Sequence, residues 1–149
     1  MFVEGQFDKE ILTQALGATR DTAIYEVDVV DVPSEVLQRH GLTSGNKQRV
    51  IALSKEFAQL PSDALVRCLI DRDLDHWFGE VTDSPRLRWT RFCSIESHFL
   101  TPEVVRDVVL TTGRAKISQT ELFVSSLFAV LKTLYSLRFA DRQLGHGLK

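Results

Sequence analysis

Three acidic residues follow apolar stretches of the sequence, at positions where carboxylates can bind a cation. Glu4 comes directly after Phe2-Val3, and Asp71 and Asp73 follow the apolar run at residues 65–70. Because Asp71 and Asp73 are two residues apart, their side chains point the same way in an extended segment. Carboxylate oxygens without thiol or imidazole partners favour a hard cation such as Mg²⁺ or Mn²⁺. Such ions activate water and stabilise the leaving oxygen in phosphodiester cleavage.

The elements that would position these acids alternate between strands and helices. Apolar or β-branched runs predict strands at residues 1–3, 23–32, 65–70 and 87–92. Helical spacing predicts helices at 6–17, 34–40, 46–60 and 118–139, and another that begins at Pro102. Ser34 is a candidate cap for the second helix. We expect an open α/β fold, a mainly parallel four-stranded sheet with helices on both faces and a C-terminal helical extension.

Parallel strands bring acids that are distant in sequence to one edge of the sheet. Glu4 and Asp71 each follow a strand, and ligands of open α/β sheets bind at the carboxyl ends of the strands. A plainer interpretation stays open for each acid, because acidic turns are often solvated loops or helix caps, and Asp75 is a candidate cap for the segment that begins at His76. Lys47 lies near a predicted helix N-terminus, where it meets a phosphate or is an ordinary surface lysine.

Composition and charge limit the classes of protein to consider. The net charge is −2, but residues 1–85 carry 8 basic and 15 acidic side chains, whereas residues 86–149 carry 10 basic and 5 acidic. An acidic half beside a basic half suits a polyanion held partly through cations, and it also suits two solvated faces of opposite sign. The sequence has no signal peptide and no uninterrupted apolar span, so we expect a cytoplasmic protein without a membrane partner. Cys68 and Cys93 have no zinc-ligand spacing, and we expect both in or near the core.

Residues 1–100 are expected to form the metal-binding α/β core and residues 101–149 the helical extension. The first strand starts three residues before its turn, so we expect the chain to be part of a longer protein. The last helix is apolar on more than one side. It therefore requires a partner surface, which is missing sequence, a second copy in a homo-oligomer, or the domain's own core.

Four segments, in order, resemble the Toprim domain. Segment 2–5 (FVEG) with Asp8 is similar to its first motif, and segment 69–73 (LIDRD) to its Asp-x-Asp motif. Segment 45–50 (GNKQRV) and segment 90–100 (TRFCSIESHFL) resemble the domain-of-unknown-function 4435 family, related to the Toprim domains of OLD-type nucleases and of PARIS-type phage-defence effectors. Two departures exist: no glycine follows the Asp-x-Asp step, and residues around 33–40 are an insertion.

The resemblance implies roles for the residues that match. Glu4 would be a metal ligand or general base, Asp71 and Asp73 would be metal ligands, and Glu96 would be a further acid that binds metal. Lys47 joins the catalytic group, with Asp8 and Asp75 as auxiliary acids; the cation would be Mg²⁺ or Mn²⁺.

The leading hypothesis is a divalent-metal-dependent nuclease that acts on DNA or RNA, partnered with an ABC-type ATPase in phage defence. The second hypothesis is a non-catalytic Toprim-fold interaction module of an ATPase complex. A phosphatase related to haloacid dehalogenases is third, because the Asp71-x-Asp73 step comes late in the chain for that class. Without a G-x-G-x-x-G or Walker loop, any ATPase would be a separate domain or protein.

Overall fold

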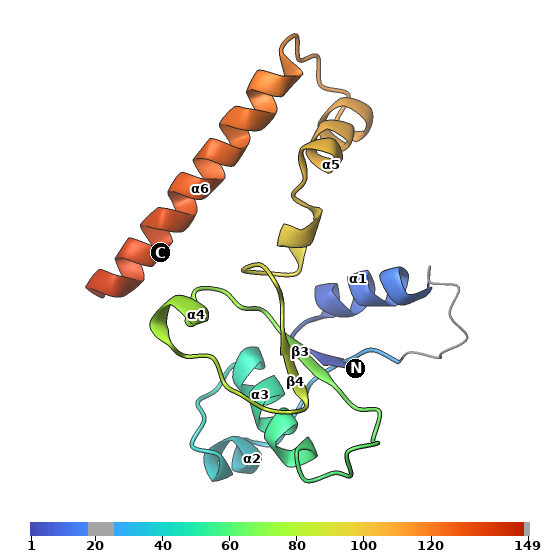
Figure 1. Ribbon diagram of the computed structural model, residues 1–149, viewed down its shortest axis with the longest axis vertical. Helices are drawn as coiled ribbons and strands as arrows, with labels where there is room; N and C mark the ends of the chain where they lie inside the picture. Colours follow the sequence, from blue (N-terminus) through green and yellow to red (C-terminus); the bar gives the residue numbers. More distant parts are fainter. Residues whose placement is uncertain (18–25, 148–149) are drawn as a thin grey trace. The chain divides into compact units, whose positions relative to one another are not determined.

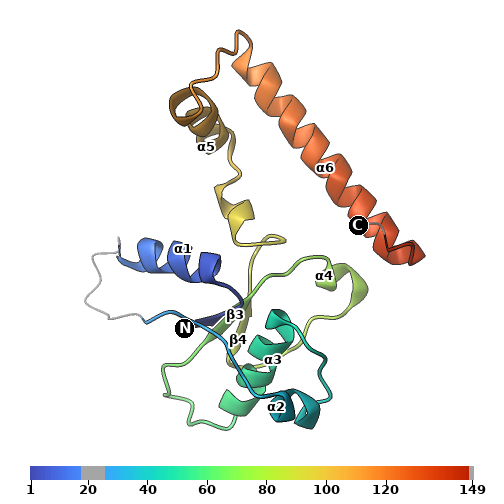
Figure 2. The same ribbon diagram turned by 180° about the vertical axis from the view of Figure 1, so that it is seen from behind.

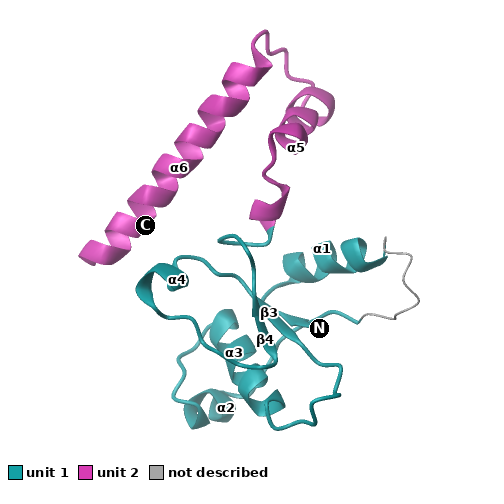
Figure 3. Cartoon of the chain, in the orientation of Figure 1, with its two compact units in different colours: residues 1–95 teal, residues 96–149 magenta. Residues whose placement is uncertain are grey.

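The computed structural model describes residues 1–17 and 26–147, and the chain divides into two compact units, Met1–Ile95 and Glu96–Lys149 (Figure 3). The first unit therefore ends before the boundary expected at residue 100. Each unit is described by itself below.

The first unit contains an open sheet of four parallel strands in the order β2-β1-β3-β4 (Figure 1). The strands are β1 (Phe2–Val3), β2 (Asp28–Val29), β3 (Cys68–Ile70) and β4 (Leu87–Trp89). The predicted parallel α/β sheet is confirmed, with strands shorter than expected because each pairing lasts for at most three residues before the chain turns away. Residues 23–25 of the predicted second strand lie outside the described residues.

Helices cover both faces of this sheet. They are α1 (Gln6–Gly17), α2 (Ser34–Arg39), α3 (Asn46–Phe57) and α4 (Asp75–Phe78). The chain moves from β1 to one neighbour, β2, and then back across to the other neighbour, β3. Because crossovers between parallel strands are right-handed, the two connections pass over opposite faces. Helix α1 accordingly lies on one side of the sheet, and α2 and α3 lie on the other (Figures 1 and 2).

The core of the first unit lies between α3 and the sheet. Its buried cluster comprises Val30, Val50, Ile51, Cys68, Ile70 and Leu87. Helix α1 on the other face has no buried residue. The α3 side therefore supplies most of the apolar burial that holds β1 and β3 side by side.

A buried arginine, Arg86, binds the segment of chain that follows α3. Arg86 is 4% exposed, and its guanidinium donates hydrogen bonds to the main-chain carbonyls of Phe57, Leu60, Pro61 and Ala64. Arginine presents five donors in a rigid fork, so one side chain can satisfy several carbonyls at the end of a helix. Arg86 thus fixes the connection from α3 to β3.

Two helix starts agree with the sequence and one does not. Asn46 begins α3 after Gly45, and Pro102 begins α5 after Thr101, whose hydroxyl accepts a hydrogen bond from the Val104 main-chain nitrogen. The expectation that Ser34 caps α2 is wrong. Ser34 is already inside the helix, because the fixed φ of Pro33, at −58°, takes the capping position without a side-chain hydrogen bond.

The second unit consists of helical segments. After a 3₁₀ turn at Glu96–Phe99 come α5 (Pro102–Asp107), a π-helical turn at Val108–Thr112 and α6 (Thr120–Leu144). Helix α6 runs beyond its predicted end at residue 139 and stops at Gly145, whose φ of 70° is left-handed. Among the described residues of this unit, the buried hydrophobic side chains are Val105 and Val124.

Helix α6 has the length and composition of a membrane span. Its 25 residues correspond to about 37 Å of helix, against roughly 30 Å for the hydrocarbon core of a bilayer. Ser125, Ser126, Lys132 and Thr133 interrupt its apolar residues, so no uninterrupted run marks it in the sequence. The same composition is typical of a core helix in a globular protein. The expectation of no membrane partner stays a prediction.

Candidate functional site

Two of the predicted acids lie side by side at the carboxyl edge of the sheet. Glu4 follows β1 and Asp71 follows β3, and these two strands are neighbours. The main-chain nitrogen of Asp71 donates a hydrogen bond of 2.9 Å to Oε1 of Glu4. The order of the strands reverses between β1 and β3, which is where open α/β sheets bind their ligands. The predicted convergence of Glu4 and Asp71 is therefore observed.

Main-chain hydrogen bonds hold the segment that carries Asp71 and Asp73. Oδ1 of Asp71 accepts a bond of 2.9 Å from the main-chain nitrogen of Ile95, and the Asp73 nitrogen donates at 2.7 Å to the carbonyl of Cys93. Asp73 has a φ of 47°, a left-handed conformation that aspartate adopts more readily than most residues. The segment does not stay extended at Asp73. The prediction that the Asp71 and Asp73 side chains point the same way, which required an extended segment, therefore does not apply.

Thr90 is a buried residue of this site to which sequence reasoning assigned no role. Its hydroxyl accepts a bond of 3.0 Å from the Arg72 nitrogen and donates one of 2.8 Å to the Phe92 carbonyl. It therefore ties the loop after β3 to the chain leaving β4. A signal existed in the sequence, since a threonine at the end of a strand beside an acidic turn can bond to the backbone of that turn.

Lys47 links α3 to the acidic loop. Its ammonium nitrogen lies 2.5 Å from Oδ2 of Asp73 and 3.0 Å from Oδ2 of Asp75, and its side chain is 18% exposed. The same nitrogen lies 5.6 Å from the centroid of the Trp89 ring, within the range of a cation–π contact. The interpretation of Lys47 as an ordinary surface lysine is therefore wrong. It is the counter-ion of two acids in the loop.

Burial and neighbouring charges shift the pKa values of Glu4 and Lys47. Burial raises the pKa of Glu4 above its ordinary value, and the nearby carboxylates of Asp73 and Asp8 add to the rise, against the Asp71 N–H and the Lys47 charge. Burial lowers the pKa of Lys47, but its hydrogen bonds to Asp73 and Asp75 outweigh burial, so the net shift is upward. Lys47 is accordingly charged at neutral pH, and Glu4 holds a proton more readily than an exposed glutamate.

The auxiliary acids occupy different surroundings. Asp8 accepts a hydrogen bond of 3.0 Å from the Gly5 nitrogen at the start of α1, and it lines a small hollow with Asp71 and the apolar residues Val3, Leu69, Ile70 and Ile95. Asp75 does not cap α4: Leu74 is the capping residue, without a side-chain bond. Oδ2 of the Asp75 carboxylate lies 3.0 Å from the Lys47 ammonium nitrogen.

Glu96 belongs to the second unit. It is the first residue of that unit and begins the turn at Glu96–Phe99, where its side chain is exposed. The group described above consists of Glu4, Asp8, Lys47, Asp71, Asp73 and Asp75 and is built within the first unit. The role of Glu96 as a metal ligand stays a prediction.

The donor chemistry of this group suits a hard cation, and a lysine already lies among its carboxylates. The acids offer carboxylate oxygens without thiolate or imidazole, as Mg²⁺ and Mn²⁺ prefer. Within residues 1–17 and 26–147, however, no three side chains of histidine, cysteine, aspartate or glutamate are arranged to hold an ion. The Lys47 ammonium provides the positive charge beside Asp73 and Asp75.

Cys68 and His40 of this unit have contacts that are common in folded proteins. Cys68 is fully buried, and burial raises the pKa of its thiol to about 11, so it is an unreactive core residue, as expected. Nε2 of His40 lies 2.7 Å from Oε1 of Glu56, and this contact, with Arg39 nearby, lowers the pKa of Glu56. Neither feature belongs to the acidic group.

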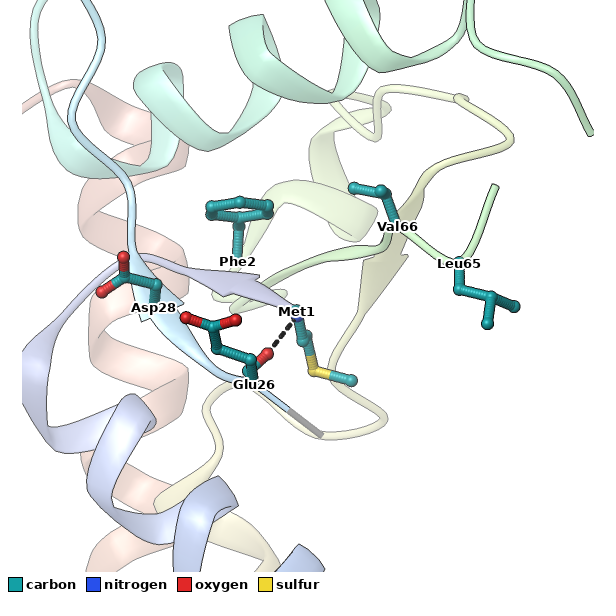
Figure 4. A pocket seen from close by; sticks show the side chains of 6 residues that line it. All are labelled: Met1, Phe2, Glu26, Asp28, Leu65 and Val66. Atoms are coloured by element: carbon teal, nitrogen blue, oxygen red, sulfur yellow. Dashed lines mark hydrogen bonds between the residues drawn. The ribbon is translucent and has the colours of Figure 1, made fainter. Parts of the chain in front are cut away.

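A second hollow lies at the opposite edge of the sheet. Its lining residues are Met1, Phe2, Glu26, Asp28, Leu65 and Val66, which lie at the amino ends of the strands (Figure 4). The Met1 amino group donates a hydrogen bond of 2.5 Å to the Glu26 carbonyl across this hollow. None of the predicted site residues lines it. The acidic group at the carboxyl edge is therefore the better candidate for chemistry.

Comparison with known proteins provides no family for this chain. No protein-family model matches it, and no curated protein or solved structure matches it. Its function therefore has to be argued from the acidic group itself.

Proposed function

We propose that this chain is a divalent-metal-dependent, Toprim-type nuclease domain that hydrolyses phosphodiester bonds of DNA or RNA. The observation that supports it most is the hydrogen bond between the Asp71 nitrogen and Glu4 Oε1 at the point where the strand order reverses. This bond keeps two carboxylates, 67 residues apart in sequence, at one ligand-binding edge.

The roles of the residues follow from their environment. Glu4, Asp71 and Asp73 would hold Mg²⁺ or Mn²⁺, with Glu96 as a further ligand. The bound ion would lower the pKa of a water molecule and stabilise the leaving oxygen. The raised pKa of Glu4 suits a residue that accepts a proton from the attacking water. Lys47, at the first turn of α3, supplies a positive charge beside the phosphate.

The proposed partners are a nucleic acid and an ABC-type ATPase, and the proposed location is the cytoplasm. The nucleic acid is supported by the basic excess of residues 86–149. The ATPase partner and a part in phage defence are supported by the resemblance of segments 2–5, 45–50, 69–73 and 90–100 to the domain-of-unknown-function 4435 family.

A specific observation favours the second candidate function, a non-catalytic interaction module. Along the 25 residues of α6, Val124 is the buried residue, whereas Val130, Leu134 and Leu137 are all more than half exposed. Apolar surface of this extent is typical of protein interaction sites. Such a module would use α6 to bind an ATPase or a second copy of the chain, and its acids would have no catalytic role.

Cleavage assays with the full chain separate the two functions. Purified protein is incubated with plasmid DNA, single-stranded DNA and tRNA while Mg²⁺ or Mn²⁺ is titrated. We expect metal-dependent cleavage that falls by about 100-fold or more in Glu4→Gln and Asp71→Asn, because these variants lose a ligand and a proton acceptor.

Matched controls show whether any loss is specific to the site. Glu35→Gln and Asp63→Asn remove exposed carboxylates outside the acidic group and are expected to cleave like the wild type. Equal residual cleavage by the wild type and by the Glu4 and Asp71 variants would contradict the catalytic proposal and favour the interaction module.

A further inference from the structure

The position of Lys47 suggests more than an affinity for phosphate. A surface lysine that binds phosphate has its ammonium group in solvent. The Lys47 ammonium instead donates hydrogen bonds to two carboxylates, those of Asp73 and Asp75. Its side chain is mostly buried, and its ammonium nitrogen lies 5.6 Å from the centroid of the Trp89 ring. The lysine is therefore held inside the acidic group.

Hydrogen bonds hold the backbone of the loop that carries Asp71 and Asp73. The nitrogens of Asp71, Arg72 and Asp73 each donate to a fixed acceptor, namely Glu4, Thr90 and the Cys93 carbonyl. Entry of a cation does not require the loop to fold.

We infer that Lys47 is a tethered counter-cation of Asp73 and Asp75 that competes with a divalent ion for these carboxylates. This inference rests on the proposed function, since it concerns the same metal site. Two cations cannot share these carboxylates at close range without mutual repulsion. The lysine has to release Asp73 when the ion binds, and it becomes available to a phosphate at that moment. Metal binding and phosphate binding are thereby coupled through one side chain.

The charge of Lys47 also reaches Glu4, whose pKa it lowers against the effect of burial. Removal of this charge leaves Glu4, Asp73 and Asp75 without their common cation. The attraction of these carboxylates for an incoming ion then increases. A lysine with a merely structural role would have no such effect on metal affinity.

The test measures Mn²⁺ binding to metal-stripped full-length protein, by the loss of the electron paramagnetic resonance signal of free aqueous Mn²⁺. We expect Lys47→Met to bind Mn²⁺ about tenfold more tightly than the wild type, within the usual range of coupling between sites. Lys47→Gln keeps an N–H donor for Asp73 without the charge and should show the same increase in Mn²⁺ affinity. It serves as the second uncharged variant if Lys47→Met does not fold. Lys47→Arg should bind like the wild type.

The matched control is Lys9→Met, which removes another lysine–aspartate pair of 3.0 Å, with Asp28. It should leave Mn²⁺ affinity unchanged. Adding Asp71→Asn to Lys47→Met should abolish the gain, which places the ion at the acidic group. If the wild type binds Mn²⁺ and both uncharged Lys47 variants bind it equally well or more weakly, the inference is overturned. The proposed metal site is then unaffected. Absence of binding in every protein overturns both.

Discussion

Helices α3 and α6 differ in what they do with their apolar residues. Helix α3 has 12 residues, several of them charged, yet it buries Val50 and Ile51 in the core cluster with residues of the sheet. Helix α6 has 25 residues, most of its positions apolar, yet Val124 is its buried residue. Apolar composition therefore does not decide which helix builds the core. The crossover that carries the chain from β2 to β3 places α3 on the sheet, because parallel strands require a covering connection.

The comparison predicts a large difference between two truncations. Ile51 is 4% exposed and Leu134 is 52% exposed. We expect Ile51→Ala to lower the free energy of unfolding by roughly 3 kcal/mol, from lost burial and a new cavity. Leu134→Ala should change it by less than about 0.5 kcal/mol.

Urea unfolding measures both effects. Tryptophan fluorescence follows the first unit, because Trp77 and Trp89 lie there, and circular dichroism at 222 nm follows all helices. A loss of more than about 1 kcal/mol in Leu134→Ala would mean that the exposed side of α6 is covered in solution, and would break the comparison.

The second prediction concerns the support of α3 at its C-terminal end. Arg86→Met keeps most of the apolar stem but removes the donors to the carbonyls of Phe57, Leu60, Pro61 and Ala64. We expect a loss of about 3 kcal/mol, because four main-chain carbonyls lose a charged donor. The tryptophan midpoint measures it. Arg88→Met, at an exposed position of the neighbouring strand, is the control and should stay near the wild type.

The third prediction, the smallest, concerns Glu4, whose charged form is disfavoured by burial. Glu4→Gln keeps Oε1 as an acceptor for the Asp71 nitrogen but removes a charge that burial disfavours. In metal-free buffer at neutral pH we expect the variant to be more stable by about 1 kcal/mol, a common size for such substitutions.

The pH dependence of this gain follows from the direction of the Glu4 pKa shift. A carboxyl whose pKa is raised on folding carries no penalty below its ordinary pKa of 4.5, where both states are protonated. The penalty grows as the pH rises from this ordinary pKa through the raised pKa of the folded protein, and it is constant above that. The advantage of Glu4→Gln should therefore appear between these two pKa values and persist at neutral pH. Thermal unfolding from acid to neutral pH measures it, with Glu35→Gln as the control. A gain that is equally large at acid pH would show that the charge is not its cause.

Much of the fold followed from local patterns. The parallel sheet was predictable because apolar runs alternate with helical spacing, and the start of α5 was predictable because Pro102 fits a first helical position. The capping roles of Ser34 and Asp75 were predicted wrongly, since Pro33 and Leu74 precede these helices instead. The boundary of a helix can move by one residue with the backbone angles of its neighbours, and the capping position moves with it.

The sequence alone determined which acids come to the carboxyl edge of the sheet, because parallel strands end there, and Glu4 and Asp71 each follow one. Only the tertiary structure decided how the acids are held. The bond from Asp71 to Glu4 and the pairing of Lys47 with Asp73 and Asp75 join residues from 26 to 67 positions apart. Local patterns do not encode such contacts, because they depend on how α3 packs against the sheet. That packing turned a lysine at a helix start into the cation of the acidic group.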